Sequence, residues 1–189
     1  MSFGYSVLGF GSIAGTPPFS VAAQSNTTAS GASITTPSFA AGDIAIVSVY
    51  KGMSTANLSA SLPTGFTQIS ARSRDTKGGT VTQYQNLLTC YKVLAAGDTS
   101  IASTNATAMS VSVYRPNTAI TTVAVQDLSD DGSVTINCSA SSVSTIAFGV
   151  SLNYNGAAPT HTWGAGPTVN QAVGQLRAGD YVQNPQASD

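Results

Sequence analysis

Histidine chemistry in this chain would depend on one residue. His161 is the only histidine and lies in the segment Pro-Thr-His-Thr-Trp-Gly, beside the only tryptophan, Trp163. A Ser-His-Asp triad or a histidine general base would need His161, but no Gly-x-Ser-x-Gly segment supplies a nucleophile. We therefore expect His161 to be a structural or surface residue. Trp163 could stack on a sugar face, although plugging the end of an apolar core is the more common role.

The acidic residues form one dense cluster but no marked catalytic pair. All eight are aspartates, and three lie in the segment Asp127-Leu-Ser-Asp130-Asp131-Gly132. Such carboxylates could bind calcium with help from backbone carbonyls. The spacing does not match an EF-hand loop, and a hairpin turn is the favoured interpretation. No two aspartates are marked as an acid and base for glycoside cleavage. We predict no catalytic residue, no cofactor and no metal site.

Two further patterns have simple structural explanations. Cys90 and Cys138 both lie in expected strands, where buried free thiols are the simplest interpretation and one disulfide across a sandwich is the alternative. The segment 9–14 matches Gly-x-Gly-x-x-Ala, but Pro17-Pro18 prevents a following helix and no acidic residue occurs before Asp43. A dinucleotide site needs both features, so we expect a glycine turn.

The low content of charged residues limits the kinds of partner that the protein can bind. Only 8% of residues are charged, against about 25% in average soluble proteins, and glutamate is absent. Abundant serine and threonine favour turns and strands. A surface with little charge gains little solubility from repulsion, which indicates that much of it is covered in an assembly. The net charge of −1 predicts no nucleic-acid or membrane partner, and we expect neither a signal peptide nor a membrane helix.

The few cations are unevenly spread along the chain. Five of them could form a small basic patch near the loops that follow the first core strands: Lys51, Arg72, Arg74, Lys77 and Lys92. Solvated strand ends explain these residues adequately.

Short apolar runs between turn signals predict an all-β, antiparallel β-sandwich. We expect a sandwich domain over 33–175, an N-terminal arm or edge segment over 1–32 and a polar C-terminal tail over 176–189. The expected strands are 33–36, 43–50, 66–71, 80–94, 99–104, 109–115, 120–126, 133–138 and 145–154. One helical turn could occupy 95–98. The segments 44–52 and 146–156 resemble each other, which fits two similar halves that each contribute a central strand; chance similarity is an equal explanation.

Three motifs in the middle of the chain resemble a recurrent domain of bacteriophage structural proteins. They are a Gly-Asp-aliphatic strand start at 42–47, a Pro-x-Gly-aromatic-Thr turn at 63–67 and a Tyr-Lys-Val segment followed by Gly-Asp at 91–98. The strand end 113–115 and the strand from Ile146 also fit. The resemblance covers roughly 35–164 and implies a jelly-roll-like sandwich in a tail, fibre or decoration protein. It implies no catalytic residues.

Two functions follow as expectations. The first is a non-catalytic virion structural protein, such as a capsid decoration, spike, collar or tail component, made in the host cytoplasm and assembled as a homo-oligomer with other virion proteins. In it, a neighbouring subunit could complete the sandwich, with the loose N-terminal arm as the donor strand. The alternative is a receptor- or carbohydrate-binding module on a phage tip or cell surface, using exposed loop residues. The candidate contact residues are Tyr50, Tyr154, His161 and Trp163. An enzyme is not expected.

Overall fold

Every regular element in the described part of the chain is a strand. The computed structural model describes residues 2–10, 21–54, 58–78, 81–116, 123–130, 144–152, 171–173 and 176–183. The strands are β1 (Ser2–Phe10), β2 (Val21–Ser30), β3 (Ser33–Thr35), β4 (Ile44–Ser54), β5 (Thr67–Gly78), β6 (Val81–Val93), β7 (Ser100–Ala102), β8 (Ala108–Pro116), β9 (Val123–Asp130), β10 (Ser144–Leu152), β11 (Gln171–Val173) and β12 (Leu176–Gln183). The predicted all-β fold is confirmed. No helix among these residues is long and apolar enough to cross a membrane.

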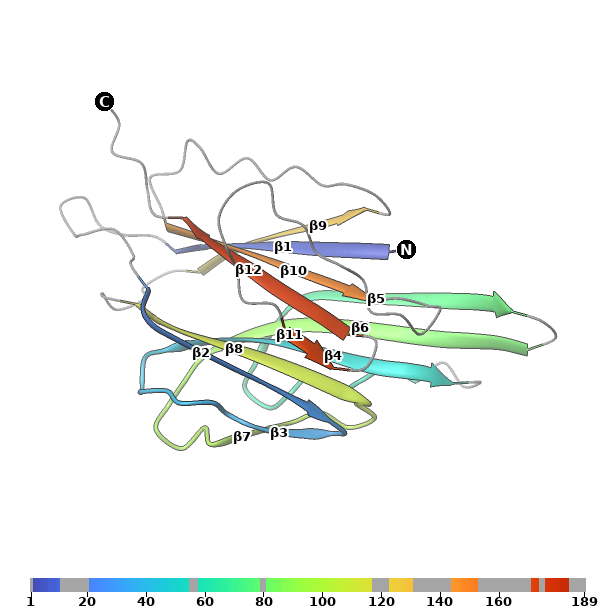
Figure 1. Cartoon of the computed structure of the whole chain (residues 1–189), viewed down its shortest axis with the longest axis horizontal. Coiled ribbons are helices and arrows are strands. Elements are labelled where there is room, and N and C mark those ends of the chain that lie inside the picture. The colour runs from blue at the N-terminus through green and yellow to red at the C-terminus, as the bar shows by residue number, and fades with distance from the viewer. Residues whose placement is uncertain are drawn as a thin grey trace, which may run out of the picture.

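The strands form three antiparallel sheets arranged in layers (Figure 1). Sheet A has the order β11-β12-β10-β1-β9, sheet B the order β2-β8-β4-β6-β5, and sheet C consists of β3 and β7. β11 lies against β2 and β8, while β1 and β9 lie near β5. Sheets A and B therefore stack as a sandwich, with β11 over one edge of sheet B and β9 over the other.

Strand β4 shows why sheet B is the central layer. Ile44, Ala45, Ile46, Val47, Ser48 and Val49 are all fully buried. Successive side chains of a strand point to opposite faces, so both faces of β4 must be covered. One face packs against sheet C and its loops in an apolar core, which comprises Ile34, Ala45, Val47, Val49, Phe66, Leu88, Cys90, Leu94, Ile101, Met109, Val111 and Val113.

The face of sheet B toward sheet A has a different character. One row of hydroxyl side chains crosses all five strands in register: Thr28, Ser110, Ser48, Thr89 and Ser70. Ser48 and Ser110 are fully buried, and neither hydroxyl has a hydrogen-bond partner among the described residues. A buried hydroxyl without a partner costs about 1–3 kcal/mol. The contact between sheets A and B is therefore less favourable at this row than the apolar core on the opposite face.

The two similar segments, 44–52 and 146–156, occupy equivalent positions in the two large sheets. β4 contains the segment 44–52 and is the middle strand of sheet B. β10 contains most of the segment 146–156 and is the middle strand of sheet A. Each of the two similar segments therefore lies in the central strand of its sheet, while their origin in two similar halves stays a prediction. The strands of sheet B lie within 21–116, whereas those of sheet A lie within 2–10 and 123–183. Between β2 and β8 the chain passes back and forth between sheets B and C, and it forms sheet A before and after that stretch.

The expected loose ends are paired strands where the structure describes them. β1 lies inside sheet A between β10 and β9, and β2 forms an edge of sheet B. Within the N-terminal arm or edge segment that was expected over 1–32, β2 is an edge strand. β1 is instead an interior strand, because it is hydrogen-bonded to a strand on each side. The C-terminal segment also contains a strand, β12, between β10 and β11. Residues 95–98 form a turn closed by Asp98 N–H donating to Ala95 C=O at 3.0 Å. The expected strand 133–138 lies outside the described residues.

We predict opposite effects for two classes of buried serine. Ser48→Ala removes an unpaired hydroxyl and should raise the free energy of unfolding by about 1 kcal/mol. Ser103→Ala is the matched control, because the equally buried Ser103 hydroxyl donates to Ser61 C=O, and it should lower that energy by about 1 kcal/mol. Urea unfolding of both variants measures the difference. A destabilised Ser48→Ala protein would mean that its hydroxyl has a partner, such as a bound water.

Candidate interaction surface

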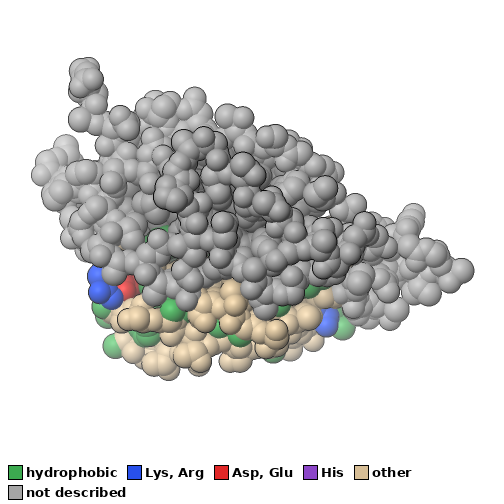
Figure 2. All heavy atoms as spheres, in the orientation of Figure 1, with side chains coloured by type: hydrophobic (Ala, Val, Ile, Leu, Met, Phe, Trp, Pro, Cys, Tyr) green, Lys and Arg blue, Asp and Glu red, His purple; other side chains and the backbone are tan. Residues whose placement is uncertain are grey.

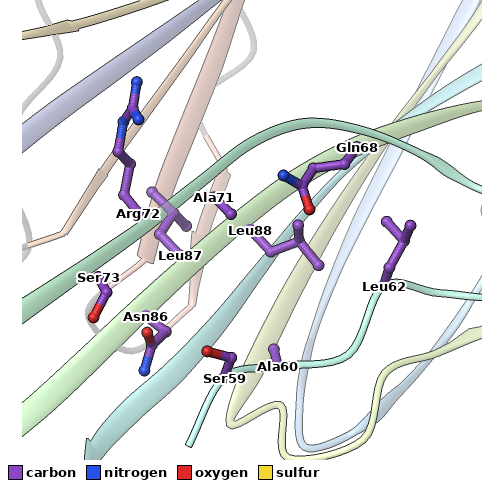
Figure 3. A pocket seen from close by; sticks show the side chains of 10 residues that line it. All are labelled: Ser59, Ala60, Leu62, Gln68, Ala71, Arg72, Ser73, Asn86, Leu87 and Leu88. Atoms are coloured by element: carbon purple, nitrogen blue, oxygen red, sulfur yellow. The ribbon is translucent and has the colours of Figure 1, made fainter. Parts of the chain in front are cut away.

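A groove of about 290 Å³ lies beside the β5 edge of sheet B. Loop 58–62 forms one wall, and β5 and β6 form the floor and the other wall (Figure 3). Figure 3 shows the Arg72 side chain directed away from the loop residues Ser59 and Leu62. The residues that line the groove are Ser59, Ala60, Leu62, Gln68, Ala71, Arg72, Ser73, Asn86, Leu87 and Leu88.

Hydrogen bonds hold the loop wall in place. Asn86 Nδ2 donates to Leu58 C=O at 2.8 Å, and Asn105 Nδ2 donates to Ser59 C=O at 3.3 Å. Ser61 N–H donates to Thr104 C=O at 3.0 Å, while Thr104 N–H donates to the Ser61 hydroxyl at 2.7 Å. Asn105 has a φ of 66°, a conformation that Asn adopts more readily than most residues. The groove is therefore preformed and does not depend on a ligand for its shape.

The lining suits a polypeptide better than a reactive substrate. It combines neutral hydrogen-bonding groups and aliphatic side chains with the guanidinium group of Arg72, and Leu62 on its wall is 42% exposed. None of its lining residues is aromatic or acidic. Across the part of the chain that the structure describes, no group of three His, Cys, Asp or Glu residues could hold a metal ion.

The visible face of the described region is poor in charge. Figure 2 shows mainly neutral polar side chains and backbone there, with scattered apolar side chains and charged side chains of both signs toward the ends. This distribution matches the 8% charged content of the sequence and leaves hydrogen bonds and apolar contacts as the main means of recognition on that face.

Of the four predicted contact residues, the structure describes only Tyr50. It lies in β4 and is 3% exposed, and its hydroxyl accepts a hydrogen bond from Gln85 Nε2 at 3.3 Å. Burial raises the pKa of Tyr50, and the bond from Gln85 partly opposes that rise. The expectation of an exposed loop position for Tyr50 was wrong, because β4 continues to Ser54 and both its faces are covered. Tyr154, His161 and Trp163 lie outside the described residues.

The structure decides between a free thiol and a disulfide for Cys90. Cys90 is a free, fully buried thiol in the core between sheets B and C, and desolvation by burial raises its pKa. A raised pKa keeps the thiol protonated and unreactive. The simpler of the two interpretations therefore holds for Cys90. Cys138 lies outside the described residues, as do residues 131 and 132 of the possible calcium segment.

The Gly-Asp motif ties the start of β4 to the ends of two other strands. The Asp43 carboxylate, almost fully buried, receives two hydrogen bonds from Arg115: Nε to Oδ1 at 3.0 Å and Nη2 to Oδ2 at 2.9 Å. Ala40 N–H donates to Oδ2 at 2.7 Å. The backbone of Asp43 accepts from Leu94 N–H at 2.7 Å, and Gly42 N–H donates to Leu94 C=O at 2.9 Å. The motif therefore stabilises the junction of β4, β6 and β8.

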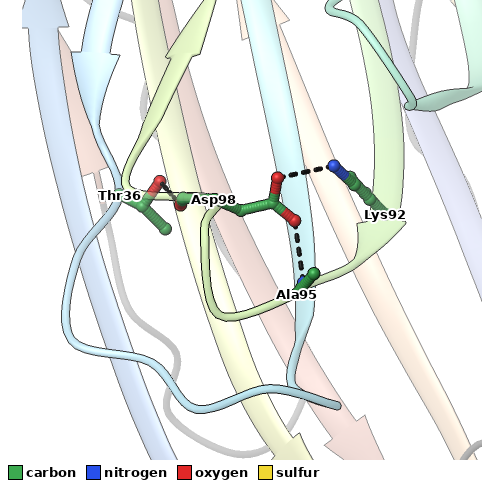
Figure 4. Close-up of polar contacts among 4 residues, drawn as sticks. All are labelled: Thr36, Lys92, Ala95 and Asp98. Carbon is green, nitrogen blue, oxygen red and sulfur yellow. Dashed lines mark hydrogen bonds and ion pairs between the residues drawn. The ribbon is translucent and has the colours of Figure 1, made fainter.

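The other two motifs meet at Lys92, whose ion pair with Asp98 is drawn in Figure 4. Lys92 Nζ pairs with Asp98 Oδ1 at 2.6 Å and lies 5.9 Å from the centre of the Phe66 ring. Asp98 Oδ2 accepts from Ala95 N–H at 2.8 Å, and Thr36 Oγ1 donates to Asp98 C=O at 2.6 Å. Gly65 has a φ of 77°, and a side chain there would approach Lys92 Nζ to 3.2 Å. The Pro-Thr-Gly turn and the Tyr-Lys segment thus form one structural contact.

Sequence reasoning did not find the groove. Its loop wall and its strand floor are separate in the chain, and tertiary hydrogen bonds, such as that from Asn86 Nδ2 to Leu58 C=O, bring them together. The available signal was the pair Leu58 and Leu62 in an otherwise small and polar loop, since exposed leucines often mark a contact surface.

Comparisons with protein-family models, curated proteins and solved structures found no match for this chain.

We predict unequal stability losses at the two motif aspartates. Asp43→Asn removes the charge from a buried carboxylate that accepts two hydrogen bonds from the part-exposed Arg115 and one from Ala40 N–H, and it should lower the free energy of unfolding by about 2 kcal/mol. Asp98→Asn is the control, because its pair with Lys92 is partly exposed, and it should cost less than about 1 kcal/mol. Urea unfolding at neutral pH measures both losses. Equal losses would contradict the structural role assigned to Asp43.

The contribution of Asp98 should depend on pH. The hydrogen bond from Lys92, followed by that from Ala95 N–H, lowers the pKa of Asp98 in the folded protein. A group with a lowered pKa stabilises the fold above its unfolded pKa, which is about 3.9 for Asp, and loses that contribution as the pH falls through the folded pKa. The stability difference between the native protein and Asp98→Asn should therefore be constant above about pH 5 and shrink below about pH 4. Urea titrations across this range would show a constant difference if Asp98 makes no such contribution.

Proposed function

We propose that this protein is a non-catalytic structural component of a bacteriophage particle that acts through protein–protein assembly. The observation that carries the proposal is the preformed groove beside an edge strand, with the exposed Leu62 on its wall. Edge strands add strands from partner chains, and neighbouring pockets then select the partner's side chains. The groove and β5 together offer both elements.

The chemistry of the motifs also supports a structural role. Asp43, Lys92 and Asp98, the charged residues of the three phage-like motifs, each make contacts that hold strands and turns together. These side chains are engaged in folding contacts instead of facing the groove. The resemblance of the motifs to phage structural domains supplies the virion setting, and the sparse surface charge fits a surface covered by neighbours.

A protein partner is favoured over a glycan at this groove. Sugar recognition commonly uses an aromatic face, and the groove lining contains no aromatic residue. Tyr50, the described member of the proposed glycan contacts, is inside the fold. We therefore assign the groove to another virion subunit.

Mass spectrometry of particles purified from the source culture tests the virion assignment. We expect peptides of this protein at a stoichiometry comparable to known structural subunits, and persistence through a density gradient. Recovery of the protein only in the particle-free supernatant would refute the assignment.

We predict that Leu62→Asp reduces incorporation into particles by about tenfold or more, since a charge in a contact core must lose its hydration. Val93→Asp is the matched control: Val93 is equally exposed, at 42%, but lies at the end of β6 outside the groove lining. Quantitative immunoblots of gradient-purified particles measure incorporation, with thermal melting of both variants to show that each folds. Equal incorporation of the two folded variants would exclude the groove as the contact.

A further inference from the structure

The two layers of the sandwich come from separate stretches of the chain (Figure 1). All strands of sheets B and C lie within 21–116, whereas those of sheet A lie within 2–10 and 123–183. β1 is hydrogen-bonded to both β9 and β10, so backbone hydrogen bonds join the two stretches of sheet A to each other. Sheet A is therefore one hydrogen-bonded unit, and only two segments of chain connect it covalently to sheets B and C.

The unit formed by sheets B and C has a core of its own. Every residue of the apolar core lies between Ile34 and Val113, on the face of sheet B that is turned away from sheet A. The pair of Asp43 with Arg115 and the hydrogen bond from Ser103 to Ser61 C=O also lie within this stretch. None of these contacts involves a residue of sheet A. Separation of sheet A would therefore leave them in place.

The face of sheet B toward sheet A contains groups that favour separation and groups that oppose it. Ser48 and Ser110 are opposite each other in the register of β4 and β8, and both hydroxyls are buried without a partner. Water would hydrate them once the layers part, so their desolvation cost exists only in the closed state. Ile44, Ile46 and Tyr114 are fully buried on the same face and keep the layers closed. The hydroxyls reduce the preference for closure without abolishing it.

We propose that sheet A opens from sheet B as one cooperative unit while sheets B and C stay folded. Proteins open in such units with free energies below that of global unfolding. The opening gives solvent access to the face of sheet B that carries the hydroxyl row, and it does not require the apolar core to melt. The sandwich thus contains a detachable layer. This inference is independent of the proposed virion role.

Hydrogen exchange of the native full-length protein, followed by mass spectrometry, is the first test. We expect the amides of β1, β9, β10 and β12 to exchange faster than those of β4, β6 and β8. Low concentrations of urea should accelerate the amides of sheet A together, with a smaller urea dependence than at β4, since that dependence scales with the surface exposed. Exchange of sheet A without urea dependence indicates local fraying, and a dependence equal to that of β4 indicates a single unit. Either result overturns the proposal.

Two adjacent residues of β4 give a matched pair of variants, because Val47 belongs to the apolar core and Ser48 lies on the opposite face. Val47→Ala weakens a core that is intact in the open state, so it should accelerate exchange of β4, β6 and β8 about tenfold and leave sheet A unchanged. Ser48→Ala removes a cost of the closed state, so it should slow exchange of sheet A about fivefold.

The two variants also define the results that contradict the detachable layer. Equal acceleration of both layers by Val47→Ala would show that they unfold together. Unchanged or faster exchange of sheet A in Ser48→Ala would show that the hydroxyl does not oppose closure. Ile101→Val is a milder loss in the same core and replaces Val47→Ala if that variant does not fold, with an expected acceleration of β4, β6 and β8 by about fivefold.

Discussion

The burial of both faces of β4 is the constraint on which the rest of the structure depends. Six consecutive residues, from Ile44 to Val49, have no exposed surface, and a strand can reach that state only with a layer on each side. Sheet C with its loops provides one layer and sheet A the other. Each end of β4 then needs support: Asp43 and Arg115 supply it where the strand begins, and Thr107 N–H donates to Tyr50 C=O at 2.7 Å farther along.

The two covered faces of sheet B differ in chemistry. The face toward sheet C is apolar and contains the core that holds residues 29–113 together. The face toward sheet A carries the hydroxyl row and two unpaired hydroxyls. This difference explains why the recognisable motifs gather around sheet B: they close its turns and anchor its strand ends. Their ionisable groups are used in these contacts, so the motifs mark a fold and do not mark a reaction centre.

In a chain with 15 charged residues, the position of each charge carries unusual weight. Two pairs, Asp43 with Arg115 and Lys92 with Asp98, stabilise the described fold. Charged residues also occur in the sequences of the edge strands β5 and β9. Charged residues in an edge strand oppose the addition of further strands.

The sequence alone determined the all-β class, the core strand at 43–50 and the turn around Pro63. These features depend on neighbours within a few residues, where alternation and turn-forming residues act directly. Only the tertiary structure decided that β1 is an interior strand, that Tyr50 is buried and that a groove lies beside β5. Each of these depends on cross-strand register and on which layer covers a face. Asp43 and Arg115 are 72 residues apart, and no local pattern encodes their contact.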